Sequence, residues 1–239
     1  MDRFQALFGI DPAAVRETCV LIPFVTRSIL RDFGIGRMNR GRLYSSGVGP
    51  DWTLIQTRIG PVFAGDAVLH LKSTPCREII FLGTGGLFRE DGPRRIGSLI
   101  CPSVWYARES FTELAIGKDS PVIEVFPDPR LRRSLIRAAG LEEDGDSAGV
   151  SFGSLELQAG ERDIWRGRGA EVVDLESAAV LAAAGRINRR AAALLAVSDI
   201  VGARPFDRQL SRDEKTRLQQ SLNRAARSIC ACIKEKLNG

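Results

Sequence analysis

Apolar runs and segments of helical spacing follow one another along the 239 residues of this chain. A short run of apolar, often β-branched residues predicts a strand buried on both faces, and strict alternation predicts a strand buried on one face. From these patterns we expect strands over 18–25, 52–59, 78–83, 97–102, 120–126, 148–157, 170–175 and 191–200. Apolar residues three and four positions apart predict helices over 62–72, 128–140, 176–185 and from 211 onwards.

Residues at the expected helix ends support two of these helices. Asp128 precedes its helix as an N-cap, Pro129 takes the first position and Gly140 follows the end. Ser211 and Glu214 have the spacing of a capping box, in which each side chain bonds the other residue's backbone N–H. The apolar residues of this last helix keep helical spacing: Leu218, Leu222, Ala225, Ile229, Ile233 and Leu237.

The alternation of strands and helices predicts an α/β fold with a parallel or mixed sheet and flanking helices. The length suits one such domain, or at most two small ones. In folds of this class, functional sites gather where strands end. Three expected strand ends carry glycines or polar residues, at 83–86, 175–177 and 198–200, so we expect one site built from three distant segments.

Composition and charge exclude several classes of protein. The chain is 44% hydrophobic and 26% charged, which is typical of a soluble globular protein. No apolar run approaches the length of a membrane span, and the N-terminal segment is too charged for a signal peptide, so we expect a cytoplasmic protein. The net charge of +5 comes mostly from scattered arginines, which indicate a solvated surface rather than a nucleic-acid groove.

The cysteines and the single histidine argue against disulfide and metal chemistry. The five cysteines are odd in number and include no C-x-x-C pair, so we expect reduced thiols. Because His70 is the only histidine, we expect neither a zinc site nor a Ser–His triad.

Two acidic residues, Glu176 and Asp199, stand in otherwise apolar and small-residue surroundings. Carboxylates are rarely placed there unless something pairs with them or uses them. Each also has a structural explanation: Glu176 suits the first turn of a helix, and Asp199 suits an N-cap or an Asx-turn. The glycines of "FLGTGGLF" (81–88) either let the backbone approach a ligand or form a tight turn, and they match neither a dinucleotide fingerprint nor a P-loop.

Four segments resemble the nucleoside phosphorylase/nucleosidase superfamily, which includes purine nucleoside phosphorylases, uridine phosphorylases and methylthioadenosine/adenosylhomocysteine nucleosidases. "VVDLESAA" followed by "AVSDI" is similar to that family's Val-Glu-Met-Glu-like segment and later Ser-Asp pair. "IIFLGTGGL" looks like its glycine turn, and "RIGPVFAGDAVLHL" like its early Gly-Ile-Gly-Pro stretch. The segments occur in family order from about residue 58 to 200. The resemblance implies a single domain over 1–239, with a three-layer α/β/α architecture and a central mixed sheet.

The resemblance also implies roles for individual residues. Glu176 corresponds to the carboxylate that holds the ribose 2′- and 3′-hydroxyls, and Asp199 to the acid that protonates or hydrogen-bonds the purine N7. A carboxylate accepts both hydroxyl bonds, and neutralising the leaving base helps the sugar through an oxocarbenium-like state. The remaining substrate-binding positions implied are Gly83, Thr84, Gly85, Phe152, Leu175 and Ser198.

The sequence departs from the family at the position of its phosphate-binding arginine. Phe81 stands where phosphorylases usually carry that arginine, and the early Gly-Asp-Pro-like loop is replaced by "LIPFVTRSIL" (21–30). Arg27 and Arg58 are the candidate substitutes for phosphate binding, with phosphate as a possible co-substrate and no other cofactor expected.

The position of the water-activating glutamate of the hydrolytic branch also differs. The residues there, Thr26 to Ser28, include no competent general base. Phosphorolysis, hydrolysis and nucleoside binding without turnover therefore all stay open, as does the nucleoside itself. The family is commonly oligomeric, so we expect a homo-oligomer, in which Arg40 and Arg42 are either donors to a neighbouring subunit or ordinary surface charge.

Overall fold

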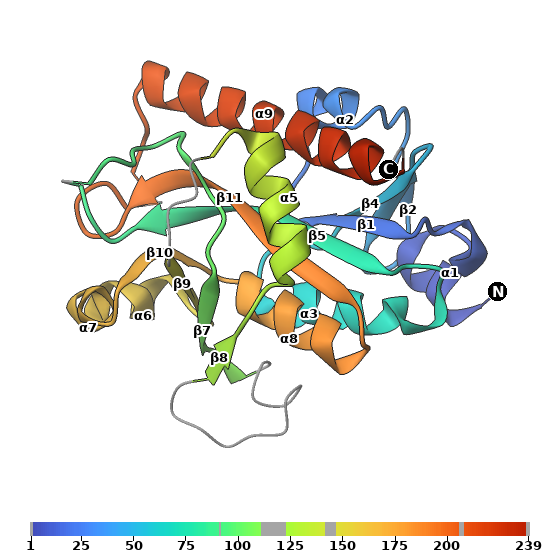
Figure 1. Cartoon of the computed structure of the whole chain (residues 1–239), viewed down its shortest axis with the longest axis horizontal. Coiled ribbons are helices and arrows are strands. Elements are labelled where there is room, and N and C mark those ends of the chain that lie inside the picture. Colours follow the sequence, from blue (N-terminus) through green and yellow to red (C-terminus); the bar gives the residue numbers. More distant parts are fainter. Residues whose placement is uncertain (1, 91, 111–122, 142–146, 206–207, 238–239) are drawn as a thin grey trace.

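A mixed sheet runs through the centre of the molecule (Figure 1). The computed structural model describes residues 2–90, 92–110, 123–141, 147–205 and 208–237. Within these ranges eleven strands join one sheet. Nine of them lie in the order β2 (Asn39–Arg40), β3 (Ser45–Val48), β4 (Trp52–Gln56), β1 (Thr18–Ile22), β5 (Glu78–Leu87), β10 (Ala170–Asp174), β9 (Ala148–Phe152), β7 (Val104–Arg108) and β8 (Ile123–Val125). The other two are β11 (Arg190–Ile200), which lies along β5, and β6 (Leu99–Ile100), which pairs with β11.

The central strand of this sheet is β5, which pairs in parallel with β1 on one side and with β11 on the other. Its last two residues pair antiparallel with β10. Three pairs near the edges of the sheet are antiparallel: β2 with β3, β3 with β4, and β7 with β8. The sheet is therefore mixed, which confirms the expectation.

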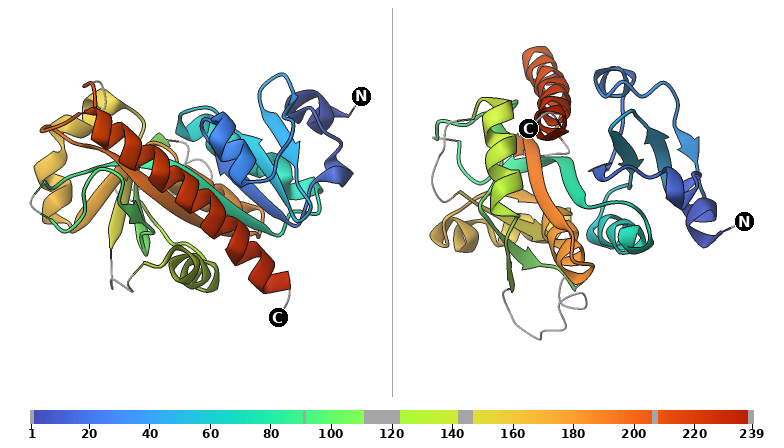
Figure 2. Two further views of the ribbon diagram at one scale, coloured as in Figure 1. Left: turned by 90° about the horizontal axis from the view of Figure 1, so that it is seen from above. Right: turned by 45° about the vertical axis from the view of Figure 1, so that its right-hand side comes forward.

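Helices cover both faces of the sheet and give the expected three-layer α/β/α architecture (Figures 1 and 2). One face carries α3 (Pro61–His70), α8 (Ser177–Arg186) and, at its edge, α1 (Arg3–Phe8). The other face carries α2 (Arg27–Asp32), α5 (Pro129–Ala139) and the long α9 (Arg212–Leu237). Two short helices, α6 (Leu155–Gly160) and α7 (Arg162–Gly167), follow β9, and two 3-10 turns cover Pro12–Ala14 and Leu71–Ser73.

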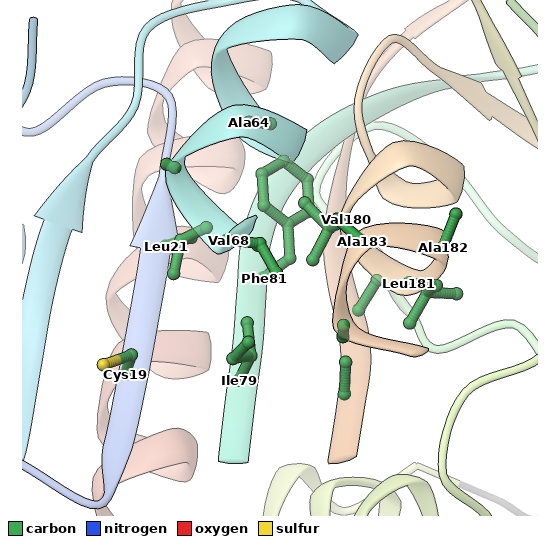
Figure 3. Close-up of a cluster of buried hydrophobic side chains, with 14 of the residues drawn as sticks. Cys19, Leu21, Ala64, Val68, Ile79, Phe81, Val180, Leu181, Ala182 and Ala183 are labelled. Atoms are coloured by element: carbon green, nitrogen blue, oxygen red, sulfur yellow. The ribbon is translucent and has the colours of Figure 1, made fainter. Parts of the chain in front are cut away.

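The side chains of β5 alternate between two apolar cores, because successive residues of a strand point to opposite faces. Ile79 and Phe81 belong to the core under α3 and α8, whereas Ile80 and Leu82 belong to the core under α5 and α9. Figure 3 shows the Phe81 ring between the two helices of the first core. The alanines of α8 allow it to pack closely against α3 and the sheet; they are Ala178, Ala179, Ala182, Ala183 and Ala184.

The helix signals of the sequence are confirmed at α5 and α9. The Asp128 side chain accepts the backbone N–H of Leu131 at 2.8 Å, and Gly140 ends α5 in the left-handed conformation. Ser211 and Glu214 form the reciprocal capping box at the start of α9. These features depend on neighbouring residues only, which is why the sequence pattern predicts them.

The prediction that β5 ends at Gly83 is wrong, since the strand continues to Leu87. The glycine segment is not a turn, because β11 pairs with it along its whole length. The strand predicted over 148–157 ends at Phe152, after which the Ser154 side chain caps α6. Glu176 is the residue before α8 rather than its first residue.

Other strand ends also differ from the patterns. β1 ends at Ile22, β4 at Gln56 and β8 (Ile123–Val125) at Val125, each earlier than predicted, and residues 120–122 of the predicted 120–126 strand lie outside the described residues. Of the expected 97–102 strand, Leu99 and Ile100 form β6. The sequence patterns gave no signal for several short elements: α1, α2, α6, α7, β2, β3 and β7.

All five cysteines are buried, and the structure joins none of them in a disulfide. Among the described residues, no helix is both long and apolar enough to cross a membrane.

Candidate active site

A pocket lies where β5, β10 and β11 meet. Its lining comes from 84–86 of β5, from 173–176 at the end of β10, and from Ser198 and Asp199 of β11. The segments after β1 and β4 complete it with Pro23, Phe24 and Ile59, and α6 adds Leu155 and Gln158. The parallel strands β1, β4, β5 and β11 all end on this side of the sheet. The three distant strand ends singled out in the sequence are thus brought together by the sheet topology.

Glu176 occupies the N-cap position of α8, but its side chain makes no capping hydrogen bond to that helix. Instead, Glu176 Oε1 accepts the backbone N–H of Gly60 at 2.6 Å. Gly60 has φ +113°, a conformation that residues with a Cβ rarely adopt, so a glycine is needed to aim this N–H. The Glu176 carboxyl is therefore held in the pocket wall by a segment 116 residues away in the chain.

Burial raises the pKa of Glu176 to about 8, with a further increase from the nearby Asp174 carboxyl. The N–H groups of Gly60 and Leu175 act in the opposite direction. Glu176 thus has hydrogen-bonding capacity that these two donors do not fill. Hydroxyl donors of a ligand would favour its ionised form.

Asp199 follows an irregularity in β11. The register with β5 shifts between Val197 and Asp199, so Ser198 is an extra residue, and such bulges re-aim the side chains beside them. The Ser198 hydroxyl donates to Asp199 Oδ1 at 2.6 Å. Burial raises the pKa of Asp199, opposed by this hydrogen bond. Asp199 therefore keeps its proton to a higher pH than an ordinary aspartate, as a general acid requires.

Asp174 is a third buried acid of the pocket and was missed by the sequence analysis. It accepts the Ser151 hydroxyl at 2.5 Å, the Ser177 hydroxyl at 2.5 Å and the Ser177 backbone N–H at 3.0 Å. Burial raises its pKa to about 6, opposed by these hydrogen bonds. Asp174, rather than Glu176, caps α8, which leaves the Glu176 carboxyl available to the pocket. The signal in the sequence is the spacing of three between Asp174 and Ser177, typical of an N-cap bonding a helix N–H.

Six of the predicted site residues line this pocket together: Thr84, Gly85, Leu175, Glu176, Ser198 and Asp199.

Two further predicted residues, Gly83 and Phe152, do not line it. Gly83 lies one residue earlier in β5, where an added Cβ would stand 2.6 Å from the Phe81 ring. Phe152 is buried, with its ring centre 6.1 Å from that of Trp165 in an edge-to-face arrangement. Gly83 and Phe152 therefore contribute to apolar packing next to the pocket, against Phe81 and Trp165 respectively.

The two arginines predicted for phosphate binding are exposed and lie outside the pocket lining. Arg27 is the first residue of α2. Arg58 has φ +78°, and its guanidinium lies 5.6 Å from the centre of the Phe63 ring. The charged side chains among the described lining residues are those of Asp174, Glu176 and Asp199, all acidic. This site is suited to a neutral ligand rich in hydroxyl and N–H groups, or to one that gains positive charge.

Comparisons with known proteins concern the family and the fold of the chain. The family model described as "Phosphorylase superfamily" matches residues 11–234. Purine nucleoside phosphorylase from Toxoplasma gondii, solved with immucillin-H, is 15% identical, with a TM-score of 0.78 and 97% of each chain covered. Uridine phosphorylase from Vibrio fischeri is 16% identical, with a TM-score of 0.74, covering 98% of this chain and 97% of that one. AMP nucleosidase from Bacteroides thetaiotaomicron is 16% identical, with a TM-score of 0.71, covering 95% of this chain and 94% of that one. No functionally curated protein sequence matches significantly.

Proposed function

The chain belongs to the phosphorylase superfamily, and on that premise we propose that it cleaves the N-glycosidic bond of a purine or modified purine nucleoside. The observation that carries this proposal is that Glu176 and Asp199 line one pocket with the glycine segment of β5. A nucleoside has one end rich in hydroxyls and one basic heterocycle, and this pocket offers a separate carboxyl for each.

In the proposed reaction Glu176 accepts hydrogen bonds from the ribose hydroxyls. These bonds strengthen as the sugar becomes positively charged in an oxocarbenium-like transition state, so they stabilise the transition state more than the substrate. The Gly60 N–H holds the carboxylate in place during this change. Thr84 and Gly85 offer backbone groups to the same ligand.

Asp199 donates its proton, or a hydrogen bond, to the purine N7. The leaving base then departs as a neutral molecule when the glycosidic bond breaks. The raised pKa of Asp199 supports this role, and the Ser198 hydroxyl orients the carboxyl.

The acceptor of the sugar is water or phosphate, and the lining favours water. A phosphate dianion would have to sit beside acidic side chains, with no cationic side chain among the lining residues that the structure describes. Phosphorolysis would need Arg27 or Arg58 to turn toward the pocket, or a cation from a neighbouring subunit. Under hydrolysis, the rate is the same with and without added phosphate.

Release of free base from a nucleoside panel tests this function. Purified protein is incubated with adenosine, inosine, guanosine, 5′-deoxy-adenosine derivatives and uridine, with and without phosphate, and base is measured by chromatography. We expect base from at least one purine nucleoside, and a loss of about 10²- to 10³-fold in kcat/KM for both Asp199→Asn and Glu176→Gln. The matched controls are Asp213→Asn and Glu235→Gln, at exposed positions of α9.

A nucleoside-binding protein without turnover is the second candidate. It is supported by Phe81 and by Thr26 to Ser28, which replace the usual phosphate arginine and water-activating glutamate of the family. Calorimetry that detects nucleoside binding, with no product after long incubation, would favour it. Turnover that disappears in Asp199→Asn would exclude it.

A homo-oligomer is supported by apolar side chains around the pocket mouth. Ile59 and Leu155 line the pocket and are 56% and 45% exposed, and Val62 and Leu157 are 61% and 66% exposed. Exposed apolar groups around a site are typical of surfaces that another subunit or ligand covers. Light scattering across a concentration series tests the oligomeric state, and fractionation of cells tests the proposed cytoplasmic location.

A further inference from the structure

A second pocket, of about 520 Å³, lies between α9 and the segment over residues 95–98. Its lining includes four arginines, Arg95, Arg217, Arg224 and Arg227. We call this pocket the α9 groove. We propose that the α9 groove binds a small anion that carries two or more linked phosphate groups.

The arginines of the α9 groove come from two facing segments and line the same pocket. Arg217 and Arg224 are seven residues apart, so they lie on one side of the helix, about 10.5 Å apart along its axis. Arg95 comes from the facing segment, which approaches α9 closely at Gly97. A Cβ on Gly97 would stand 2.9 Å from Arg217 Cβ, and Gly97 has φ +90°, so this close approach depends on a glycine.

The charges in the α9 groove are unbalanced. Arg227 forms an ion pair with Asp32 at 3.2 Å. Arg95, Arg217 and Arg224 form no ion pair with any residue that the structure describes, and none of the lining residues is acidic. Three guanidinium groups exceed the charge of one phosphate group, roughly −1.5 to −2 near neutral pH, so we infer at least two linked phosphates. Guanidinium groups bind phosphate oxygens in a bidentate manner.

A buried hydroxyl in the same lining is an independent indication of a ligand. Ser221 is 5% exposed, and its Oγ has no hydrogen-bond partner among the described residues. Buried polar groups without a partner are uncommon, and each calls for an explanation such as a ligand or an ordered water. Ser221 lies between Arg217 and Arg224 on α9 and lines the α9 groove with them.

The α9 groove is separate from the candidate active site, with which it shares no lining residue. The segment over residues 95–98, which forms one wall of the α9 groove, is hydrogen-bonded to β11, the strand that carries Asp199. Gly97 N–H donates to the Val197 carbonyl and Val197 N–H donates to the Ser98 carbonyl, both at 2.9 Å. An anion in the α9 groove is therefore not the phosphate co-substrate of the proposed reaction, and the proposal stands whether the nucleoside is cleaved by water or by phosphate.

Calorimetric titration with inorganic pyrophosphate and with orthophosphate, at matched ionic strength, tests the proposal. We expect pyrophosphate to bind at least tenfold more tightly than orthophosphate, and R217A/R224A to weaken pyrophosphate binding at least tenfold. The matched control is R130A/R137A, which removes two exposed arginines seven residues apart on α5 and should change binding less than twofold. Ser221→Ala is expected to weaken binding several-fold with an unchanged or higher Tm, a combination that a purely structural role would not give.

Three results would overturn the proposal. The first is equal affinity for orthophosphate and pyrophosphate. The second is equal weakening by the two double variants, which would indicate non-specific attraction to a basic protein. The third is displacement of pyrophosphate by a single-stranded oligonucleotide at lower concentration than by tripolyphosphate, which would identify a nucleic-acid surface. Circular dichroism of each variant shows whether it is folded.

Discussion

Gly86 leaves the space that the Asp199 carboxyl occupies. The two residues face each other across the β5–β11 pairing, just after the irregularity at Ser198. A Cβ on Gly86 would stand 2.6 Å from Asp199 Oδ2, closer than two such atoms approach in proteins. The second glycine of "TGGLF" thus has a steric role beside the proposed general acid.

Gly86→Ala is expected to lower kcat/KM for nucleoside cleavage by at least about tenfold while the protein stays folded. The added methyl displaces the Asp199 carboxyl, and a shift of about 1 Å in a catalytic group is enough to cost this much or more. The matched control is Gly92→Ala, where an added Cβ meets nothing within 4 Å. Unchanged activity in Gly86→Ala would mean that the observed position of Asp199 is not needed for the reaction.

The raised pKa of Glu176 makes stability depend on pH in the absence of ligand. Its native pKa of about 8 lies above its ordinary value of 4.5, so the native state binds more protons than the unfolded state between these values. The free energy of unfolding should therefore fall as pH rises from about 4.5 to 8, by at most about 1.4 kcal/mol per pH unit from this group.

Urea denaturation of Glu176→Gln and of the wild type from pH 5 to 9 measures this effect. Burial also raises the pKa of Asp174, to about 6, and that of Asp199, so the contribution of Glu176 is the difference between the wild-type and Glu176→Gln curves from pH 6 to 8. We expect a smaller slope for Glu176→Gln there and a higher stability than wild type at pH 8 to 9. Glu235→Gln should follow the wild-type curve, and equal slopes in all three proteins would contradict the assigned pKa.

Nucleoside binding is expected to release protons near pH 7. The ribose hydroxyls donate to Glu176 and favour its ionised form, so the proton held by the free protein leaves. Calorimetry in two buffers of different ionisation enthalpy gives the number of protons released. Glu176→Gln should release fewer protons than wild type, and equal proton release by the two proteins would exclude the proposed contact between Glu176 and the sugar.

Asp174→Asn is expected to lower the free energy of unfolding by about 2–3 kcal/mol, because an amide nitrogen would face donors that now bond to a carboxylate. The donors are Ser151 and Ser177, both fully buried. The matched control is Asp128→Asn, which changes the N-cap of α5 and should cost less than about 1 kcal/mol, since asparagine caps helices as well as aspartate does. Equal effects in urea denaturation would show that Asp174 is only an N-cap.

The sequence predicted those parts of the fold that are fixed by hydrogen bonds between residues close together in the chain. Asp128 with Gly140, and Ser211 with Glu214, bond groups within one turn of their helices, so their patterns located α5 and α9. The patterns did not predict structure that depends on residues far apart in the chain. A tight turn was one of the two alternatives for the glycine segment after Gly83, because glycines favour turns locally, whereas pairing with β11, more than a hundred residues away, keeps the segment in the sheet.

For this protein, the order of apolar runs and helical segments by itself determined the α/β fold class. The two acids in apolar surroundings, Glu176 and Asp199, indicated by themselves which residues form the candidate active site. Only the tertiary structure decided that Gly60 holds Glu176, that Asp174 caps α8 in its place, and that Gly86 makes room for Asp199. The physical reason is that hydrogen bonds and steric contacts between strand ends depend on sheet register, which is set by the packing of the whole chain and not by neighbouring residues.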